Sequence, residues 1–355
     1  MKHSTPVSLF FLTRNLQSMS FLRDKWASVL NHFHRRVVDG LIKCHLRALD
    51  LFYKERPVPL KYWQFFYWPV AILSGCSDPL FPNEDRLRTS GASLSISPLK
   101  ELLRHDILGE WSLDADTITF LWQAIREDRP KIIIECGAGV STLLLAKGLA
   151  DNRFRTKNFA SLLSLEQDVR VKEAVEKRLE ACGLKRFVTI LHAPISNRGD
   201  YQFDANQLRK HLGSQEVDWL IIDGPAGPEG CRVSTLPFLA RFCRPGARWF
   251  LDDAFRDGEL KLLNHWDSLP GIEVEGIYPI GKGLGAGVVN DPEQFGGIHD
   301  MERRAIVVGE TGPNSSSQIH PTMRLDLAVR LSASSCEVAL TFNSMKLVLW
   351  HTKLS

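Results

Sequence analysis

The stretch KIIIECGAGVSTLLLAKGLA, residues 131–150, decides the fold of this chain. Its pattern predicts a short apolar strand, a glycine-rich turn and a helix. Gly137 and Gly139 allow the backbone to turn sharply and to approach a ligand closely. Free N–H groups at the helix start favour an anionic or polar ligand, and Glu135 ends the strand with a carboxylate that can meet a cationic group. Such a turn also occurs as a purely structural feature, so the surrounding sequence has to show whether this one binds a ligand.

Apolar runs and helical stretches alternate along the chain after this turn. Further strands are expected at 162–165, 187–191, 219–222 and 249–251, between helices at 141–150, 169–182, 204–212, 233–243 and 257–267. Two last strands, 272–280 and 284–290, flank a Gly-Lys-Gly turn and suggest a terminal antiparallel hairpin. Strands that alternate with helices form βαβ units. The predicted fold is therefore α/β, with a Rossmann-like, seven-stranded, mostly parallel sheet.

Three regions are expected along the chain. Residues 1–111 form an N-terminal helical or cap region, because apolar residues recur at helical spacing over 21–53, although much of 54–110 stays unassigned. Residues 112–295 form the ligand-binding domain, which opens with a helix over 117–126 capped by Asp114 or Asp116. Residues 300–355 alternate apolar and polar side chains and predict a small antiparallel β-appendage.

Composition narrows the class of protein. The chain has 355 residues, with 44 basic against 41 acidic side chains, so its formal charge of +3 argues against a nucleic-acid partner. Seven scattered cysteines suggest reduced thiols and a cytoplasmic protein. The sequence has no apolar run of about 18 residues, so no membrane-spanning helix is expected. The basic face of 21–53 and the aromatic run 62–73 leave contact with a membrane surface open. The oligomeric state is not predicted.

The identity of the ligand is predicted by the positions at which this chain differs from a dinucleotide-binding fingerprint. That fingerprint places a third glycine where this chain has Thr142. The acid before the turn and Ser141 at the helix start fit S-adenosylmethionine (SAM) better than NAD. The next strand ends at Glu166, 27 positions after Gly139, where a carboxylate can accept both ribose hydroxyls.

The E-x-G-x-G-x-S-T pattern with its downstream acid resembles the class I SAM-dependent methyltransferases. The later string D-G-P-x-G, L-P-x-L and L-D-D-A-x-R-x-x-E resembles the bacterial methyltransferase 24-type subgroup, over about residues 112–290. The resemblance implies SAM as cofactor, held by Glu135, Gly137, Gly139, Ser141, Glu166, Ala193 and Asp223.

Three acids are the candidate catalytic residues. Asp223, Asp252 and Asp253 end neighbouring strands and should converge on one crevice. In one interpretation they hold Mg²⁺ or another divalent cation, which resembles the catechol O-methyltransferase type. That type has an Asp-Asn pair and a lysine where this chain has Asp252-Asp253 and Ala226. In a second interpretation one Asp is a general base without metal. In a third, Asp252 or Asp253 caps a helix or fixes a loop through Arg256.

The expected function is SAM-dependent O-methylation of a small molecule or of a sugar or glycan acceptor. Two alternatives remain open. One is an aminopropyltransferase-like enzyme that uses decarboxylated SAM, and the other is a non-catalytic binding or scaffold module with a methyltransferase-like fold.

Overall fold

The computed structural model describes residue 40 and residues 56–63, 87–109, 111–156 and 160–296, together with the backbone of three strands in 325–352. The chain divides into two compact units, Met1–Ile298 and His299–Ser355. The predicted helix over 21–53 except residue 40, nearly all of the aromatic run 62–73 and residues 300–324 of the predicted β-appendage lie outside the described residues. None of the described helices has the length and apolarity needed to cross a membrane.

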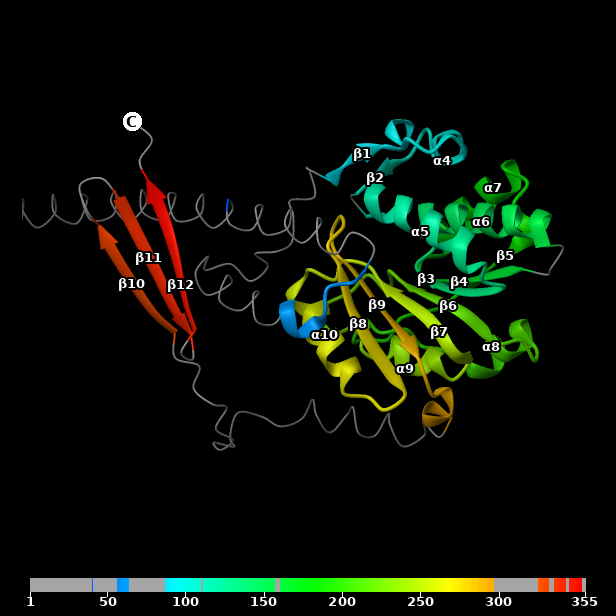
Figure 1. The fold of residues 1–355 in the computed structure, drawn as a ribbon. Helices are drawn as coiled ribbons and strands as arrows, with labels where there is room; N and C mark the ends of the chain where they lie inside the picture. The colour runs from blue at the N-terminus through cyan, green and yellow to red at the C-terminus, as the bar shows by residue number, and fades with distance from the viewer. Residues whose placement is uncertain are drawn as a thin grey trace, which may run out of the picture. The chain divides into compact units, whose positions relative to one another are not determined.

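A seven-stranded sheet forms the first unit and confirms the predicted α/β fold (Figure 1). Its strands are β3 (Ile132–Cys136), β4 (Ser161–Glu166), β5 (Val188–His192), β6 (Val217–Ile222), β7 (Cys243–Leu251), β8 (Ile272–Tyr278) and β9 (Leu284–Val289). The spatial order is β5-β4-β3-β6-β7-β9-β8. Strands β3 to β7 pair in parallel, whereas β9 runs antiparallel to β7 and β8, as expected for the terminal hairpin.

Helices cover both faces of this sheet. They are α5 (Ala115–Asp128), α6 (Val140–Thr156), α7 (Val169–Ala181), α8 (Ala205–Leu212), α9 (Thr235–Ala240) and α10 (Asp257–Asp267). In Figure 1, α5, α6 and α7 lie on one face, and α9 and α10 lie on the other. Strand β3 is buried along its whole length because it lies in the middle of this sandwich. Its three successive isoleucines, Ile132 to Ile134, are typical of a parallel strand covered on both sides.

Short elements precede the sheet in the region that the sequence left unassigned. They are β1 (Thr89–Ser90), the 3-10 helix Gly91–Ser93, α4 (Ser97–Leu102) and β2 (Ile107–Leu108). Two more 3-10 helices are found at Lys185–Phe187 and Pro292–Phe295. Val58 also pairs with Ile277 of β8, and the ring of Trp63 packs 5.0 Å from that of Phe255. Part of the N-terminal region therefore belongs to the same packed unit.

Three elements differ from their predicted ranges by more than two residues, and one of them is α6, which continues past its predicted end at 150 to Thr156. Strand β7 begins at Cys243 rather than at 249, because Cys243 already pairs with Val217 of β6. The sequence did not predict this start of β7, because the segment 244–248 is polar and three of its residues are exposed. Helix α9 ends at Ala240, so that the chain can enter β7.

The second unit contains a three-stranded antiparallel meander. It consists of β10 (Leu325–Leu331), β11 (Ser335–Phe342) and β12 (Met345–Thr352), in that order. The predicted β-appendage is confirmed, and its register pairs Leu325 with Phe342 and Phe342 with Met345.

Candidate active site

The glycine-rich turn between β3 and α6 shapes one wall of the site. Gly137 has a φ of 92°, a backbone conformation that side chains rarely adopt, and its N–H donates to the Leu165 carbonyl at 2.8 Å. Gly139 differs, because a Cβ added there would have no neighbour within 4 Å among the described atoms. The turn is therefore fixed at Gly137 and open in front of Gly139, which lines the cavity described below.

A buried hydroxyl network holds this turn from behind. The Thr142 hydroxyl accepts from the Gly139 N–H at 2.9 Å and donates to Glu135 Oε2 at 2.6 Å, and the Ser164 hydroxyl donates to the same oxygen. Burial raises the pKa of Glu135 to about 7, although the hydroxyls of Ser141, Thr142 and Ser164 lower it. Glu135 is thus part of the support under the turn.

Glu166 ends β4 and lies at the cavity wall. Its Oε2 accepts from the Ala138 N–H at 2.7 Å, and its Oε1 accepts from the Asp168 N–H at 2.8 Å. These two backbone bonds orient the carboxylate, and each oxygen keeps acceptor capacity for a further donor. A pair of neighbouring hydroxyls, such as those of a ribose, fits this arrangement.

A cavity of about 380 Å³ opens at the carboxyl ends of β3, β4, β6 and β7. This volume lies within the range of small-molecule sites. Of the residues expected to bind the cofactor, the ones that line it are Gly137, Gly139, Ser141, Glu166 and Asp223. Such a crevice beyond the strand ends is where ligands bind in open α/β sheets.

Two expected contacts lie elsewhere. Glu135 is fully buried behind the turn. Ala193 is also buried, and its N–H donates to the Glu166 carbonyl, so it helps to hold the end of β4. His192 next to it contacts the Gln167 carbonyl at 3.1 Å.

The loop after β6 brings Asp223 to the cavity. Asp223 and Gly224 both donate their backbone N–H groups to the Cys136 carbonyl, and the Gly224–Pro225 peptide bond is cis. Gln167, the residue after β4, clamps the same loop, because its side-chain amide exchanges two hydrogen bonds with the backbone of Ala226. The Asp223 side chain keeps 21% of its surface exposed. Burial raises its pKa, and the nearby Arg232 guanidinium opposes that rise.

The structure brings the three candidate acids together. One carboxylate oxygen from each of Asp223, Asp252 and Asp253 lies within 4.8 Å of the others. Asp223 and Asp253 line the cavity, whereas the Asp252 side chain is 1% exposed and lies behind them. Burial and the other two aspartates raise the pKa of Asp252 well above its usual value.

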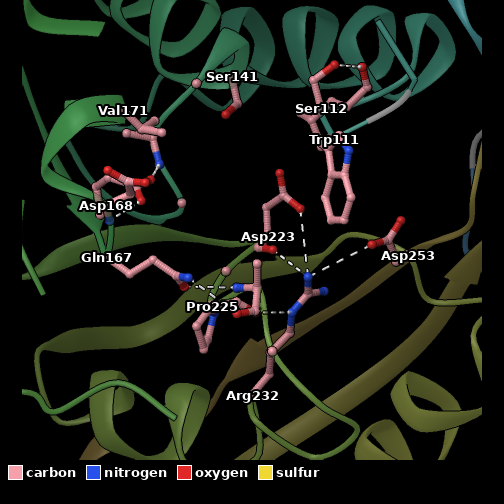
Figure 2. Close-up of a pocket in the computed structure, with 18 of the residues that line it drawn as sticks. Trp111, Ser112, Ser141, Gln167, Asp168, Val171, Asp223, Pro225, Arg232 and Asp253 are labelled. Atoms are coloured by element: carbon pink, nitrogen blue, oxygen red, sulfur yellow. Dashed lines mark hydrogen bonds and ion pairs between the residues drawn. The ribbon is translucent and has the colours of Figure 1, made fainter. Parts of the chain in front are cut away.

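Two buried cations lie among these acids. The Arg232 guanidinium lies 4.0 Å from Asp223 Oδ1 and 3.9 Å from Asp253 Oδ2, and it donates to the Asp223 carbonyl at 2.5 Å (Figure 2). The Lys282 ammonium lies 3.2 Å from Asp252 and 2.8 Å from Asp253. Asp253, with a φ of 62°, also pairs with Arg256 at 2.8 Å.

Sequence reasoning missed several residues of the cavity. Trp111 lies at its rim with 90% of its surface exposed, and Figure 2 shows its ring turned toward the same space as Asp223 and Arg232. Gln167 and Lys282 were also missed. The only sequence signal for Lys282 was its place between two glycines, which indicates a turn and says nothing about its charge partners.

Residues 134–254 match a family model described as a methyltransferase domain, the methyltransferase 24 type. No curated protein sequence matches the chain.

Solved structures with a similar fold include three methyltransferases. One is from Geobacter sulfurreducens, 17% identical over 50% of this chain and 81% of its own, with a TM-score of 0.39. Another is the O-methyltransferase TomG from Streptomyces achromogenes in complex with SAM, 16% identical over 51% and 82%, with a TM-score of 0.39. A third is the SAH-bound methyltransferase PaMTH1 from Podospora anserina, 18% identical over 49% and 78%, with a TM-score of 0.39.

Proposed function

We propose that this chain, whose residues 134–254 match the family model of a methyltransferase domain, is a class I SAM-dependent methyltransferase that methylates a hydroxyl oxygen of a small-molecule or glycan acceptor. The observation that carries the proposal is the shared cavity. The partly exposed carboxylate of Asp223 faces the space that Gly139 and Glu166 border, with the exposed ring of Trp111 at the rim.

The cofactor would lie along the wall formed by the glycine-rich turn. Glu166 would accept the ribose hydroxyls, and the backbone of Gly137 and Gly139 would allow close approach. When bound, SAM supplies an electrophilic methyl group on a sulfonium. The open space in front of Gly139 supports this position, because a side chain there would fill the cavity rather than strike the protein.

Asp223 is the proposed general base. An alcohol becomes a competent nucleophile as its proton leaves, and Asp223 is an accessible carboxylate at the end of β6. The hydrogen bonds from Asp223 and Gly224 to the Cys136 carbonyl and the Gln167 clamp hold its backbone, so the carboxylate would orient the acceptor oxygen toward the methyl group. Its raised pKa improves its strength as a base. Asp252 is unsuited to this role because its side chain is buried away from the cavity.

The acceptor would lie between Trp111 and the polar floor of the cavity. The Trp111 ring offers a flat apolar surface to one face of a ring-shaped molecule. Glu259 and Arg256 also line the cavity and offer hydrogen-bond partners for further hydroxyls. This combination favours a sugar or another polyhydroxylated ring. A polyamine is disfavoured, because Arg232 and Lys282 already neutralise the acids that would attract it.

Cofactor binding is tested by calorimetric titration of the protein with SAM and with S-adenosylhomocysteine. Gly139→Leu is expected to weaken both affinities by at least about 100-fold, since the side chain projects into the cavity. Gly139→Ala is the matched control and should lose far less. Unfolding curves establish that both variants fold. Equal binding by wild type and Gly139→Leu would place the cofactor elsewhere, and no binding by wild type would favour the scaffold alternative.

Methyl transfer is tested with methyl-labelled SAM and a panel of phenols, monosaccharides and oligosaccharides. Asp223→Asn should lower kcat by about 10²- to 10⁴-fold at nearly unchanged SAM affinity, because it removes the base. Trp111→Ala should raise the acceptor KM more than it lowers kcat. An Asp223→Asn variant with wild-type kcat would remove Asp223 from the mechanism. Turnover with decarboxylated SAM and putrescine but not with SAM would establish the aminopropyltransferase alternative.

A further inference from the structure

The Lys282 side chain is buried against the acid cluster of Asp223, Asp252 and Asp253. Lys282 lies in the turn between β8 and β9, and its side chain is 3% exposed. The turn is fixed on two sides, because the Lys282 N–H donates to Asp114 Oδ2 at 3.3 Å and its carbonyl accepts from the Phe255 N–H at 3.2 Å. The lysine backbone therefore has little freedom to withdraw, and the ammonium stays between Asp252 and Asp253.

The acid cluster needs positive charge to be stable. Three carboxylates within 4.8 Å of one another repel, and burial removes the water that would screen them. Neither oxygen of Asp252 accepts a hydrogen bond from any residue that the structure describes, so its ion pair with Lys282 is its main compensation. Arg232 supplies the second positive charge, close to Asp223, Asp253 and Glu259.

A divalent cation does not fit among these groups. Mg²⁺ and Ca²⁺ bind oxygen ligands at about 2.0–2.6 Å, and Mg²⁺ usually keeps several water molecules. An ion that close to Asp253 Oδ1 would be a direct neighbour of the Lys282 ammonium, which lies 2.8 Å from the same oxygen. The Asp252 side chain is only 1% exposed, which leaves no room beside it for the ion's water molecules. The acids have the right atoms for a metal, but the space between them already holds a cation.

We propose that Lys282, supported by Arg232, supplies the positive charge that a divalent cation supplies in metal-dependent methyltransferases of similar fold, so that this site excludes the metal. The Lys282 side chain also lines the cavity, where its charge stabilises negative charge on an acceptor oxygen. Residues 223, 252 and 253 are then an acid cluster neutralised from within the chain. The inference concerns the cavity of the proposed methyl transfer, but its test needs neither SAM nor an acceptor. A result that contradicts the exclusion of the metal therefore does not contradict the proposed methyl transfer, and the reverse also holds.

The test measures Mn²⁺ binding to the full-length protein by electron paramagnetic resonance, with Mg²⁺ as competitor. Wild type should show no saturable site below about 1 mM Mn²⁺, and Lys282→Met should gain one site at least about tenfold tighter. The methionine keeps an unbranched side chain of similar length and removes the ammonium group with its charge.

Lys261→Met is the matched control. Lys261 also lies between two carboxylates, 2.9 Å from Glu229 and 2.6 Å from Asp257, but on the surface. It should gain no comparable site. A double variant, Lys282→Met with Asp253→Asn, restores the charge balance and should lose the gained site again.

Two results would overturn the inference. One is a stoichiometric Mn²⁺ site in wild type that Asp252→Asn abolishes. The other is a folded Lys282→Met variant that gains no site. Should Lys282→Met fail to fold, the wild-type titration and Lys282→Gln, judged by the same gain, decide the question.

Discussion

Thr142 occupies the position where a dinucleotide-binding turn carries its third glycine, and its contacts explain the substitution. The hydroxyl joins the Gly139 N–H to the buried Glu135 carboxylate. A glycine could not make this link. Thr142, which favoured SAM over NAD as the ligand predicted from the sequence, therefore also holds the turn in place.

Glu135 makes folding stability depend on pH. Its pKa is about 7 in the folded protein against 4.5 for a free side chain, so unfolding releases a proton between these values and rising pH destabilises the fold. Glu135→Gln should remove this cost. Relative to wild type, the variant should gain up to about 3 kcal/mol of unfolding free energy between about pH 4.5 and pH 8.

Urea denaturation at several pH values measures this gain. Glu173→Gln, at an exposed position of α7, controls for removal of one negative charge. A difference between wild type and Glu135→Gln that stays constant with pH would contradict the raised pKa.

At the scale of elements, α5 and the β8–β9 turn meet at one carboxylate. Asp114 caps α5, because its Oδ1 accepts from the backbone N–H groups of Asp116 and Thr117 at 3.0 Å. Its Oδ2 accepts from the Thr117 hydroxyl and from the Lys282 N–H. The sequence had left Asp114 and Asp116 as alternative caps, and the structure selects Asp114 because it directly precedes the first helical residue.

Asp114→Ala should lower the unfolding free energy by about 2–3 kcal/mol, because it removes a helix cap and leaves buried donors without a partner. Asp114→Asn keeps an acceptor for the α5 cap and should lose less. Denaturation with urea measures both variants. A loss below about 0.5 kcal/mol for Asp114→Ala would mean that the cap contributes little to this fold.

At the scale of the whole molecule, the residues that line the cavity all fall between Trp111 and Lys282. They belong to the first compact unit, Met1–Ile298. A chain truncated after residue 298 should therefore bind S-adenosylhomocysteine within about twofold of the full-length affinity.

Calorimetry on the truncated and full-length chains checks this prediction, with Gly139→Leu as the negative control. A tenfold loss on truncation would show that the second unit contributes to binding.

Contact of the N-terminal region with a membrane surface and a cytoplasmic location stay predictions, as does the division of the chain into three regions.

The sequence by itself determined the alternating α/β sheet and the residues at the strand ends. Apolar runs separated by helices leave few other packings, and parallel strands bring their carboxyl ends to one edge. Gly137, Gly139, Ser141, Glu166 and Asp223 therefore line one cavity, as their positions predicted.

Only the tertiary structure decided what surrounds the acids. Lys282 reaches Asp252 and Asp253 because β9 returns antiparallel beside β7, and Arg232 enters from the segment before α9. No local pattern encodes such a meeting, since it depends on chain segments far apart in sequence. The same folding buried Asp252 away from the cavity and gave Ala193 a supporting role in the backbone. The periodicity of the sequence determines the position of a residue along a strand or helix. Packing between these elements determines which charged groups lie beside that residue.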